Sequence, residues 1–290
     1  MSAVLIVNPY ASRVAEGALA AVARELGPVE VIRTEGRGHA TELAREAAGK
    51  AEAVYVFSGD GGFNEVLNGI DGDTPVGFVP GGGTNVLPRA LGLPRDPVLA
   101  ARRLRAGRTR RISLGRANGR LFGFSAGLGL DAELIRRLDA LGRRRDGKRP
   151  GDVAFMLTTL RVLAERRARI EPTLHLEGFG RAAFALVANC DPYSYAGRLP
   201  LRVAPEARFE LGLDVVAPRA LRPWIVPQLV AHLLLGRGQA SASNILYGHD
   251  LNAIAARCDV PMPLQVDGED LGDVTEVVFC AERSAVTILA

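Results

Sequence analysis

The strongest constraint on the fold is that the hydrophobic pattern between Ala3 and Ala106 alternates repeatedly between the period of a strand and the period of a helix. Short apolar runs typical of strands alternate with longer stretches of helical periodicity. The run Ala53–Phe57 is apolar at almost every position, as expected for a parallel strand that is covered on both faces. Repeated strand–helix order of this kind predicts a doubly wound α/β domain. The expected strands are Ala3–Asn8, Val29–Arg33, Ala53–Phe57 and Val76–Val79, and the expected helices are Ala11–Leu26, Ala40–Ala48, Phe63–Asn68, Leu87–Leu91 and Pro97–Ala106.

The pattern changes after Gly115, where short β-like stretches are separated by glycine and proline. Strands of this length between closely spaced turns predict a mainly antiparallel β-sandwich. Two helical stretches interrupt it, Asp152–Arg167 and Leu221–Leu235. We therefore expect two domains, residues 1–115 and 116–290, and we allow the last strand to return to the first domain. The expected β stretches are Arg169–Leu176, Ala182–Asn189, Phe209–Val216, Ala255–Val260, Thr275–Cys280 and Val286–Leu289.

Two glycine-rich loops follow neighbouring strands of the expected α/β domain, and each leads into a helix. They are Ser58–Asn64 (SGDGGFN) and Pro80–Asn85 (PGGGTN). Glycine lets backbone N–H groups point at a ligand, and a helix start adds unpaired donors. Ligands of open α/β sheets collect at the carboxyl ends of strands. The loops therefore predict a polyphosphate site, although tight β–α turns alone would give a similar pattern. Neither loop matches GxxxxGK[ST], which argues against a Walker-type P-loop. No GxGxxG follows the first strand, which argues against a Rossmann dinucleotide site.

Four segments carry a resemblance to a known family. The run SGDGGFNEVLNG (Ser58–Gly69) resembles the GGDGTxNEVxNG signature of the diacylglycerol kinase catalytic-domain family, which includes bacterial diacylglycerol and sphingosine kinase-like lipid kinases. The run PGGGTNVLPRALGLP (Pro80–Pro94) resembles the family's PxGTxNDFARxLGxP. NPYAS (Asn8–Ser12) is similar to its NPxSG loop, and LQVDGEDLG (Leu264–Gly272) resembles its QxDGE segment.

The resemblance implies an α/β domain like that of NAD kinases and diacylglycerol kinases, followed by a β-sandwich domain. It implies that residues 1–115 bind ATP, that residues 116–290 bind the substrate, and that the nucleotide lies between them. It makes Glu269 the base at the acceptor hydroxyl and Asp267 its acidic partner, and it orients Asp60 toward nucleotide and Mg²⁺. The Mg²⁺ is implied by the nucleotide, and no protein ligand for a metal is assigned. The nucleotide contacts implied are Asn8, Thr34, Ser58, Gly59, Asp60, Gly61, Gly62, Asn64, Gly82, Gly83, Thr84 and Asn85.

The sequence departs from the family pattern at three places. Ser58 stands at the first glycine of GGDGT, and Gly62 stands at its threonine. Gly83 occupies a threonine position of the second loop, with Thr84 one residue later. Leu211 falls where an aspartate of a structural magnesium site is expected. The first two changes mean that a threonine hydroxyl contact to the nucleotide is lost or comes from another residue. The third puts the structural magnesium site in question.

The function implied by the resemblance is ATP-dependent phosphorylation of a hydroxyl group on diacylglycerol or a similar lipid. Two alternatives stay open: a kinase for a soluble alcohol such as a sugar or NAD, and a catalytically weak nucleotide- or lipid-binding relative. Spacing alone also fits Val266–Asp270 (VDGED) to an acidic hairpin turn, since Asp-Gly is a favoured turn pair.

Charge and composition limit the kinds of molecule that this chain is expected to bind. The net charge is +4, with basic runs at Arg102–Arg111 and Arg136–Arg149. Aromatic content is only 6%, and no nucleic-acid-binding signature is present, so nucleic acid is not expected. The three cysteines are scattered, which argues against disulfides and structural zinc. We expect a cytoplasmic protein, peripheral to the inner face of the membrane, and leave a homodimer open.

Three segments are candidates for contact with a membrane that holds the substrate. They are the arginine-rich Arg143–Arg149, the apolar Val153–Leu163, and Leu221–Leu235 with its Trp224. Interfacial binding combines basic charge with apolar side chains such as Trp. Both helical segments would alternatively serve only to cover the sandwich.

Overall fold

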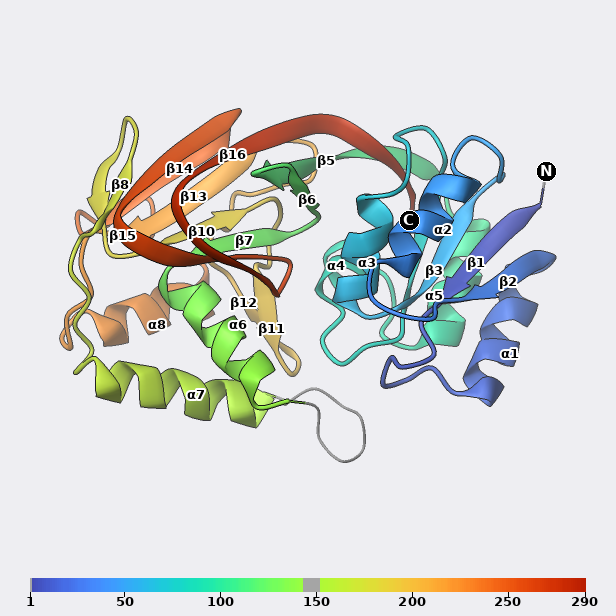
Figure 1. Cartoon of the computed structure of the whole chain (residues 1–290), viewed down its shortest axis with the longest axis horizontal. Helices are drawn as coiled ribbons and strands as arrows, with labels where there is room; N and C mark the ends of the chain where they lie inside the picture. The colour runs from blue at the N-terminus through green and yellow to red at the C-terminus, as the bar shows by residue number, and fades with distance from the viewer. Residues whose placement is uncertain (1, 143–151) are drawn as a thin grey trace. The chain divides into compact units, whose positions relative to one another are not determined.

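The computed structural model describes residues 2–142 and 152–290, and the chain divides into two compact units (Figure 1). The first unit consists of Met1–Leu114 and Arg283–Ala290, and the second of Gly115–Glu282. The chain passes between them twice, within β5 (Thr109–Ala117) and within β16 (Glu269–Leu289). The C-terminal residues therefore belong to the N-terminal unit.

The first unit is built on a parallel sheet in the order β16–β4–β3–β1–β2. Its strands are β1 (Ala3–Val7), β2 (Val29–Arg33), β3 (Val54–Ser58), β4 (Val76–Pro80) and the end of β16, where Ile288 pairs with Val76. Every residue of β3 and β4 is buried, which agrees with helices on both faces. This confirms the predicted α/β fold.

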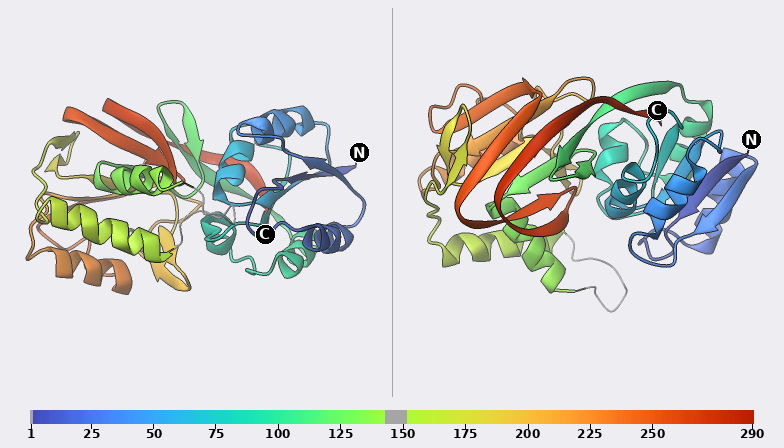
Figure 2. Two further views of the ribbon diagram at one scale, coloured as in Figure 1. Left: turned by 60° about the horizontal axis from the view of Figure 1, so that its bottom comes forward. Right: turned by 45° about the horizontal axis from the view of Figure 1, so that its top comes forward.

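Helices cover both faces of this sheet. α1 (Glu16–Leu26) and α5 (Pro97–Ala106) pack together on one face, and α2 (His39–Ala47) and α3 (Asp60–Leu67) on the other (Figure 2). The short α4 (Val86–Ala90) follows β4. Two helix starts differ from the sequence prediction. α1 begins at Glu16 because Asn8 turns the chain first, its side chain accepting from the Tyr10 N–H at 3.0 Å. α3 begins at Asp60, so the glycine loop itself forms the first helical turn.

The second unit contains an antiparallel sheet in the order β14–β13–β10–β7–β15–β16. The long β15 (Ala253–Val266) pairs with β7 through residues 264–266 and with β8 through residues 256–258. Irregular register between β15 and β16 bends both strands around one apolar core, to which most strands of the unit contribute. The predicted antiparallel β region is confirmed. Its other strands are β6 (Arg120–Phe122), β7 (Ser125–Leu128), β8 (Leu174–Leu176), β9 (Gly180–Ala182), β10 (Ala185–Ala188), β13 (Leu213–Pro218), β14 (Ile245–Leu251) and the separate pair β11 (Ser194–Ala196) and β12 (Leu199–Leu201).

Three helices lie on one side of this sheet: α6 (Leu130–Ala140), α7 (Asp152–Glu165) and α8 (Val226–Leu235) (Figures 1 and 2). They meet on a small apolar cluster of Ala183, Phe184 and Leu221, against which side chains from all three pack. α6 was not among the expected helices, and α8 begins five residues after the expected start, close to Pro223 and Pro227. Among the described residues, no helix has both the length and the apolar character needed to cross a membrane.

Candidate active site

The carboxyl ends of four parallel strands gather the predicted nucleotide residues at one edge of the first unit's sheet. Asn8 follows β1, and its N–H donates to Phe57 O at 3.0 Å. Thr34 follows β2, and its N–H donates to Val7 O at 2.8 Å. Ser58 ends β3, and its carbonyl accepts from Gly81 N at 2.6 Å. The structure therefore brings together residues that are up to 77 positions apart in sequence, between Asn8 and Asn85.

The two glycine loops touch through their backbones. A Cβ atom added to Gly82 would lie 2.7 Å from the Cα of Gly59, and one added to Gly59 would lie 3.3 Å from the Cα of Gly82. Neither contact involves a flexible side chain that could move away. The close approach of two chains thus favours glycine at both positions, most strongly at Gly82, and this is one of the standard uses of the residue. The loops form one continuous surface of backbone.

Asp60 and Asn85 fix the relative position of the loops. An Asp60 carboxylate oxygen accepts from the Leu87 N–H at 3.3 Å, linking the first turn of α3 to the first turn of α4. Asn85 adopts a left-handed conformation (φ 54°), and its side chain accepts from Gly82 N and donates to Gly82 O, both at 2.8 Å. The amides in the first turn of α3 have no partner four residues earlier within the helix. Together with the helix dipole, they make this edge suited to an anion.

The paired departures at positions 58 and 62 have a steric explanation. A Cβ atom on Gly62 would lie 2.1 Å from the hydroxyl oxygen of Ser58. A serine at 58 therefore excludes any side chain at 62. The Ser58 side chain is 1% exposed, and its hydroxyl has no hydrogen-bond partner within residues 2–142 and 152–290. Compared with the family signature, which has glycine at position 58 and threonine at position 62, this chain keeps one hydroxyl group in the space and supplies it from position 58.

The other predicted loop residues differ in their surroundings. Gly83 is exposed, with nothing within 4 Å of an added Cβ, and Thr84 is half-buried. Asn64 is completely buried, and its side-chain oxygen accepts from the Asn68 amide at 3.2 Å. This arrangement favours a structural role for Asn64 within α3 and leaves the loop surface to its neighbours.

The predicted acidic pair lies in the second unit, at the hairpin that joins β15 to β16. Asp267 and Gly268 both have positive φ (48° and 78°), as a two-residue type I′ turn requires. The Asp267 carboxylate is 4% exposed and accepts from the N–H groups of Gly123, Phe124 and Ser125 at 2.6, 3.0 and 3.1 Å. The hairpin reading is confirmed. The three bonds give Asp267 a part in holding this turn.

Glu269 is the first residue of β16, immediately after that turn. Its side chain is mostly buried, and Oε2 lies 3.2 Å from a guanidinium nitrogen of Arg120 on β6. The carboxylate is therefore held by a strand that is 149 positions away in sequence. The sequence predictions missed Arg120, and no motif around it could have singled it out.

A buried network of polar side chains, formed by Gln265, Asp131 and Tyr193, holds the same turn through hydrogen bonds. The Gln265 side-chain oxygen accepts from Gly268 N at 2.8 Å, and its NH₂ donates to an Asp131 carboxylate oxygen at 2.6 Å. Tyr193 OH donates to the same oxygen at 2.7 Å. Burial raises the pKa of Asp131, and the hydrogen bonds from Tyr193 and Gln265 oppose that rise. This network fixes the orientation of the Gln265 amide and hence the turn that carries Glu269.

The structural magnesium site implied by the family pattern does not fit these residues. Within residues 2–142 and 152–290, no three or more His, Cys, Asp or Glu side chains are grouped as metal ligands. Leu211 offers no oxygen. Nearby Asp214 is completely buried, and its carboxylate oxygens lie 2.9 and 3.0 Å from His249 Nδ1. Burial raises the pKa of Asp214, and the hydrogen bond to Asp214 raises the pKa of His249. An imidazole is thus the partner of this carboxylate.

Replacing His249 by phenylalanine should lower the free energy of unfolding by about 2 kcal/mol, because it removes the partner of a buried carboxylate. The folded-state pKa of His249 is raised, so its contribution is complete below the unfolded value near 6.5 and is lost as pH rises through the folded value. Its charged and titratable neighbours are Glu206, Asp214, Tyr247 and Asp250. Urea unfolding should therefore show a larger difference from the parent protein at pH 6 than at pH 9.

The exposed His175 of β8 provides the control for this pH dependence. His175→Gln should leave the unfolding free energy within about 0.5 kcal/mol at both pH values, as is usual for surface changes. An equal loss at pH 6 and pH 9 for His249→Phe would mean that packing, and not the charge on the imidazole, accounts for the effect.

Known proteins resemble both the sequence and the fold. Residues 2–117 match the family model described as the diacylglycerol kinase catalytic domain. The chain is 41% identical over 102 residues to a diacylglycerol kinase of Bacillus subtilis (strain 168), covering 33% of this chain and 34% of that protein. It is 37% identical over 94 residues to a diacylglycerol kinase of Staphylococcus saprophyticus, covering 31% and 30% of the two chains. The aligned part thus spans about a third of these relatives.

A solved structure extends the similarity to the whole chain at the level of fold. The crystal structure of a diacylglycerol kinase from Bacillus anthracis str. Sterne superposes with a TM-score of 0.74, covering 99% of this chain and 96% of that chain. The sequence identity of this pair is 18%, so the superposition speaks for the fold alone. Both compact units are included in this similarity.

Proposed function

We propose that this chain, whose residues 2–117 match the diacylglycerol kinase catalytic domain model, transfers the γ-phosphate of ATP to a hydroxyl group of diacylglycerol or a similar lipid. The relatives support a kinase of this family, and the lipid acceptor is our proposal. The observation that carries it is the backbone contact between Gly59 and Gly82. It builds a surface of amides where two parallel strands end, as a triphosphate requires.

On the donor side, the loop residues would bind and orient the nucleotide. The N–H groups of Gly61 and Gly62 at the start of α3 would face phosphate oxygens. Asp60, which already links the loops through Leu87 N, would orient the bound nucleotide and its Mg²⁺. The metal, held mainly by phosphate oxygens and water, would neutralise charge on the phosphates.

On the acceptor side, Glu269 would take the proton of the attacking hydroxyl. The lipid oxygen forms a bond to the γ-phosphorus, the bond to the bridging oxygen breaks, and ADP leaves. Arg120 holds the Glu269 carboxylate at 3.2 Å, and Asp267 and Gln265 hold the turn before it. A base fixed in this way needs little rearrangement before it acts.

Labelled ATP offered with vesicles that contain diacylglycerol tests the proposal directly. We expect labelled phosphatidic acid as the product, and we expect Asp60→Asn to lower kcat/KM by about 10²–10³-fold. Asparagine keeps an acceptor oxygen for the Leu87 N–H, so the loops should stay in place while the charge is lost. A fully active Asp60→Asn enzyme would refute the assigned role of this residue.

The same assay separates the alternatives. Phosphoryl transfer to a sugar or NAD without any membrane or detergent would indicate a kinase for a soluble alcohol. Tight ATP binding with no transfer to any component of a total-lipid extract would indicate a catalytically weak binding protein. We further propose a cytoplasmic location, with the enzyme peripheral to the inner face of the membrane where the lipid resides.

A further inference from the structure

Exposed apolar side chains are concentrated on two helices of the second unit. Seven of the fifteen large apolar side chains that are exposed among residues 2–142 and 152–290 belong to α7, α8 or the turn before α8. We call this set the α7–α8 face. It consists of Met156, Leu157, Leu160, Trp224, Val230, Leu234 and Leu235. Single exposed apolar residues are ordinary, but their concentration on two helices of one unit makes this face a candidate interaction surface.

The helix α8 does not have the composition of one that merely covers a core. Its sequence, VPQLVAHLLL, contains no Asp, Glu, Lys or Arg, and none of its residues is fully buried. One side of the helix, with Leu229 and Leu233, packs on the apolar clusters beneath it. The neighbouring side, about 100° around the helix, carries Val230 and Leu234, which are exposed. A largely apolar helix whose only polar side chains are Gln228 and His232, and which is half-exposed, lacks a partner for its outer side.

The two helices present their apolar side chains on the same side of the unit. Leu163 of α7 and Val226 of α8 pack against one cluster, that of Ala183, Phe184 and Leu221. A bridge between Ile170 and Leu221 joins the segment after α7 to the segment before α8. Figure 1 and the left view of Figure 2 show α7 and α8 on one side of the sheet.

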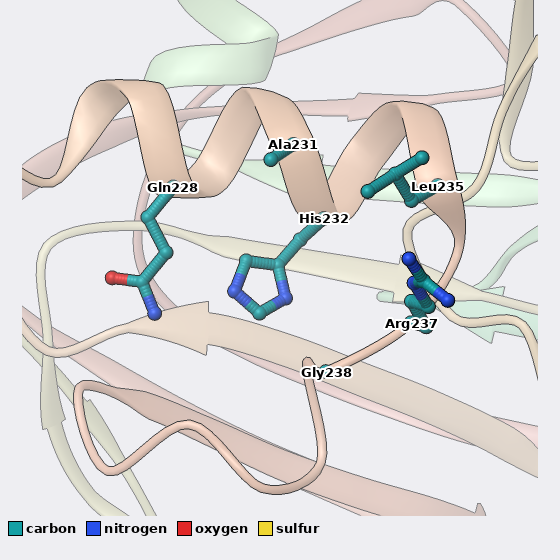
Figure 3. A pocket seen from close by; sticks show the side chains of 6 residues that line it. All are labelled: Gln228, Ala231, His232, Leu235, Arg237 and Gly238. Atoms are coloured by element: carbon teal, nitrogen blue, oxygen red, sulfur yellow. The ribbon is translucent and has the colours of Figure 1, made fainter.

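The segment that contains α8 is basic, although one of its arginines, Arg222, pairs with Glu171 at 2.8 Å. No acidic residue occurs between Asp214 and Asp250, whereas Arg219, Arg222 and Arg237 do. Arg237 lies just past the C-terminus of α8, where with Leu235 and His232 it lines a hollow of about 380 Å³ (Figure 3). The other predicted basic contact, Arg143–Arg149, lies outside the described residues.

We infer that the α7–α8 face docks on an anionic lipid bilayer, with the exposed Trp and Leu side chains entering the interface and the nearby arginines contacting headgroups. This inference rests on the proposed function, since only a lipid acceptor requires such a surface. The combination of a largely apolar helix, a Trp at its start and flanking arginines is that of an interfacial helix. The basic α8 segment, with Arg219 and Arg237 outside the Arg222–Glu171 pair, complements the anionic leaflet. A protein partner would require no such bias of charge.

The test measures binding to vesicles of phosphatidylcholine with phosphatidylglycerol and no diacylglycerol. A triple variant, Trp224→Ser/Val230→Gln/Leu234→Gln, removes exposed side chains only. It should bind these vesicles about 10–100-fold more weakly than the parent protein. The control Val31→Gln/Leu99→Gln/Val278→Gln removes apolar side chains of similar exposure elsewhere and should bind within about twofold of the parent. Arg237→Gln should weaken binding to these vesicles and not to neutral ones.

Activity assays separate this inference from the proposed function. With a short-chain diacylglycerol dissolved as monomers, the triple variant should retain the parent rate, and only the rate on vesicle-embedded diacylglycerol should fall. If the parent protein phosphorylates neither substrate, the proposed function is contradicted. The vesicle-binding measurement does not depend on activity and would still test the docking face.

Two outcomes would overturn the inference. One is unchanged vesicle binding by the triple variant. The other is a parent protein that is dimeric by light scattering and a triple variant that is monomeric, which would make the α7–α8 face an interface between two copies of this chain.

Discussion

Glu269→Gln is expected to lower kcat by about 10²–10⁴-fold while leaving the affinity for ATP within about twofold. Glutamine has nearly the same shape as glutamate, and its amide oxygen can still accept from Arg120, but it cannot take a proton from the acceptor hydroxyl. The measurement is steady-state transfer to diacylglycerol vesicles together with calorimetric titration of ATP. A loss in kcat without a loss in ATP affinity would identify Glu269 as the base.

Glu282→Gln is the matched control for this substitution. Glu282 also lies on β16 and also pairs with an arginine, Arg116, at 2.6 Å, but the pair is about 40% exposed and lies outside the hairpin. Its kcat should equal that of the parent protein. Full activity of Glu269→Gln would require another residue to serve as base and would remove the acidic hairpin from the mechanism.

Gly82→Ala should weaken ATP binding by about 10–100-fold, because the added methyl would meet the Gly59 backbone at 2.7 Å and Asn85 Oδ1 at 3.0 Å. Relieving such a contact forces the loops apart at a cost of about 1–3 kcal/mol. Calorimetric titration of ATP measures the affinity, and thermal unfolding measures how much of the strain also reduces stability.

Gly83→Ala, one residue away in the same loop, is the control for this steric effect. It shows whether replacing any glycine of the loop weakens ATP binding. An added Cβ at Gly83 meets nothing within 4 Å, so this variant should bind ATP almost as the parent does. Equal losses at the two positions would mean that backbone freedom, and not the close approach of the loops, determines nucleotide binding.

The first unit was largely predictable because its strands and helices have different hydrophobic periods. The pattern placed β1, β2 and α5 within one residue at each end. It placed α3 too late because glycines 61 and 62 are poor helix formers, yet they form the first turn of that helix. Asp60, the first residue of this helix, is hydrogen-bonded to the Leu87 N–H of the second loop's helix, a contact that the local sequence does not show.

The second unit was less predictable because its order depends on contacts between distant segments. The helix α6 was missed, since short strands and an arginine-rich run surround it in sequence. β15 and β16 were expected as short pieces, since Pro261 and Pro263 interrupt the first and polar residues interrupt the second.

The candidate site shows the same limit. The motifs located the loops and the hairpin, but they could not supply Arg120 or Asp131, which act through folded contacts across about half the chain. The exchange between Ser58 and Gly62 was visible as two separate departures. Only the position of the Ser58 hydroxyl, in the space of a side chain at 62, reveals them as one change.

The return of the last residues to the first unit constrains how the protein can be synthesised. Val286 and Ile288 are 1% and 0% exposed, and Ile288 pairs with Val76 along the outer edge of β4. When residue 114 has been synthesised, the strand that pairs with β4 at the edge of the first unit's sheet has therefore not yet been made. One edge of that sheet therefore stays unpaired while the second unit is translated, and an unpaired strand edge can pair with other chains and aggregate.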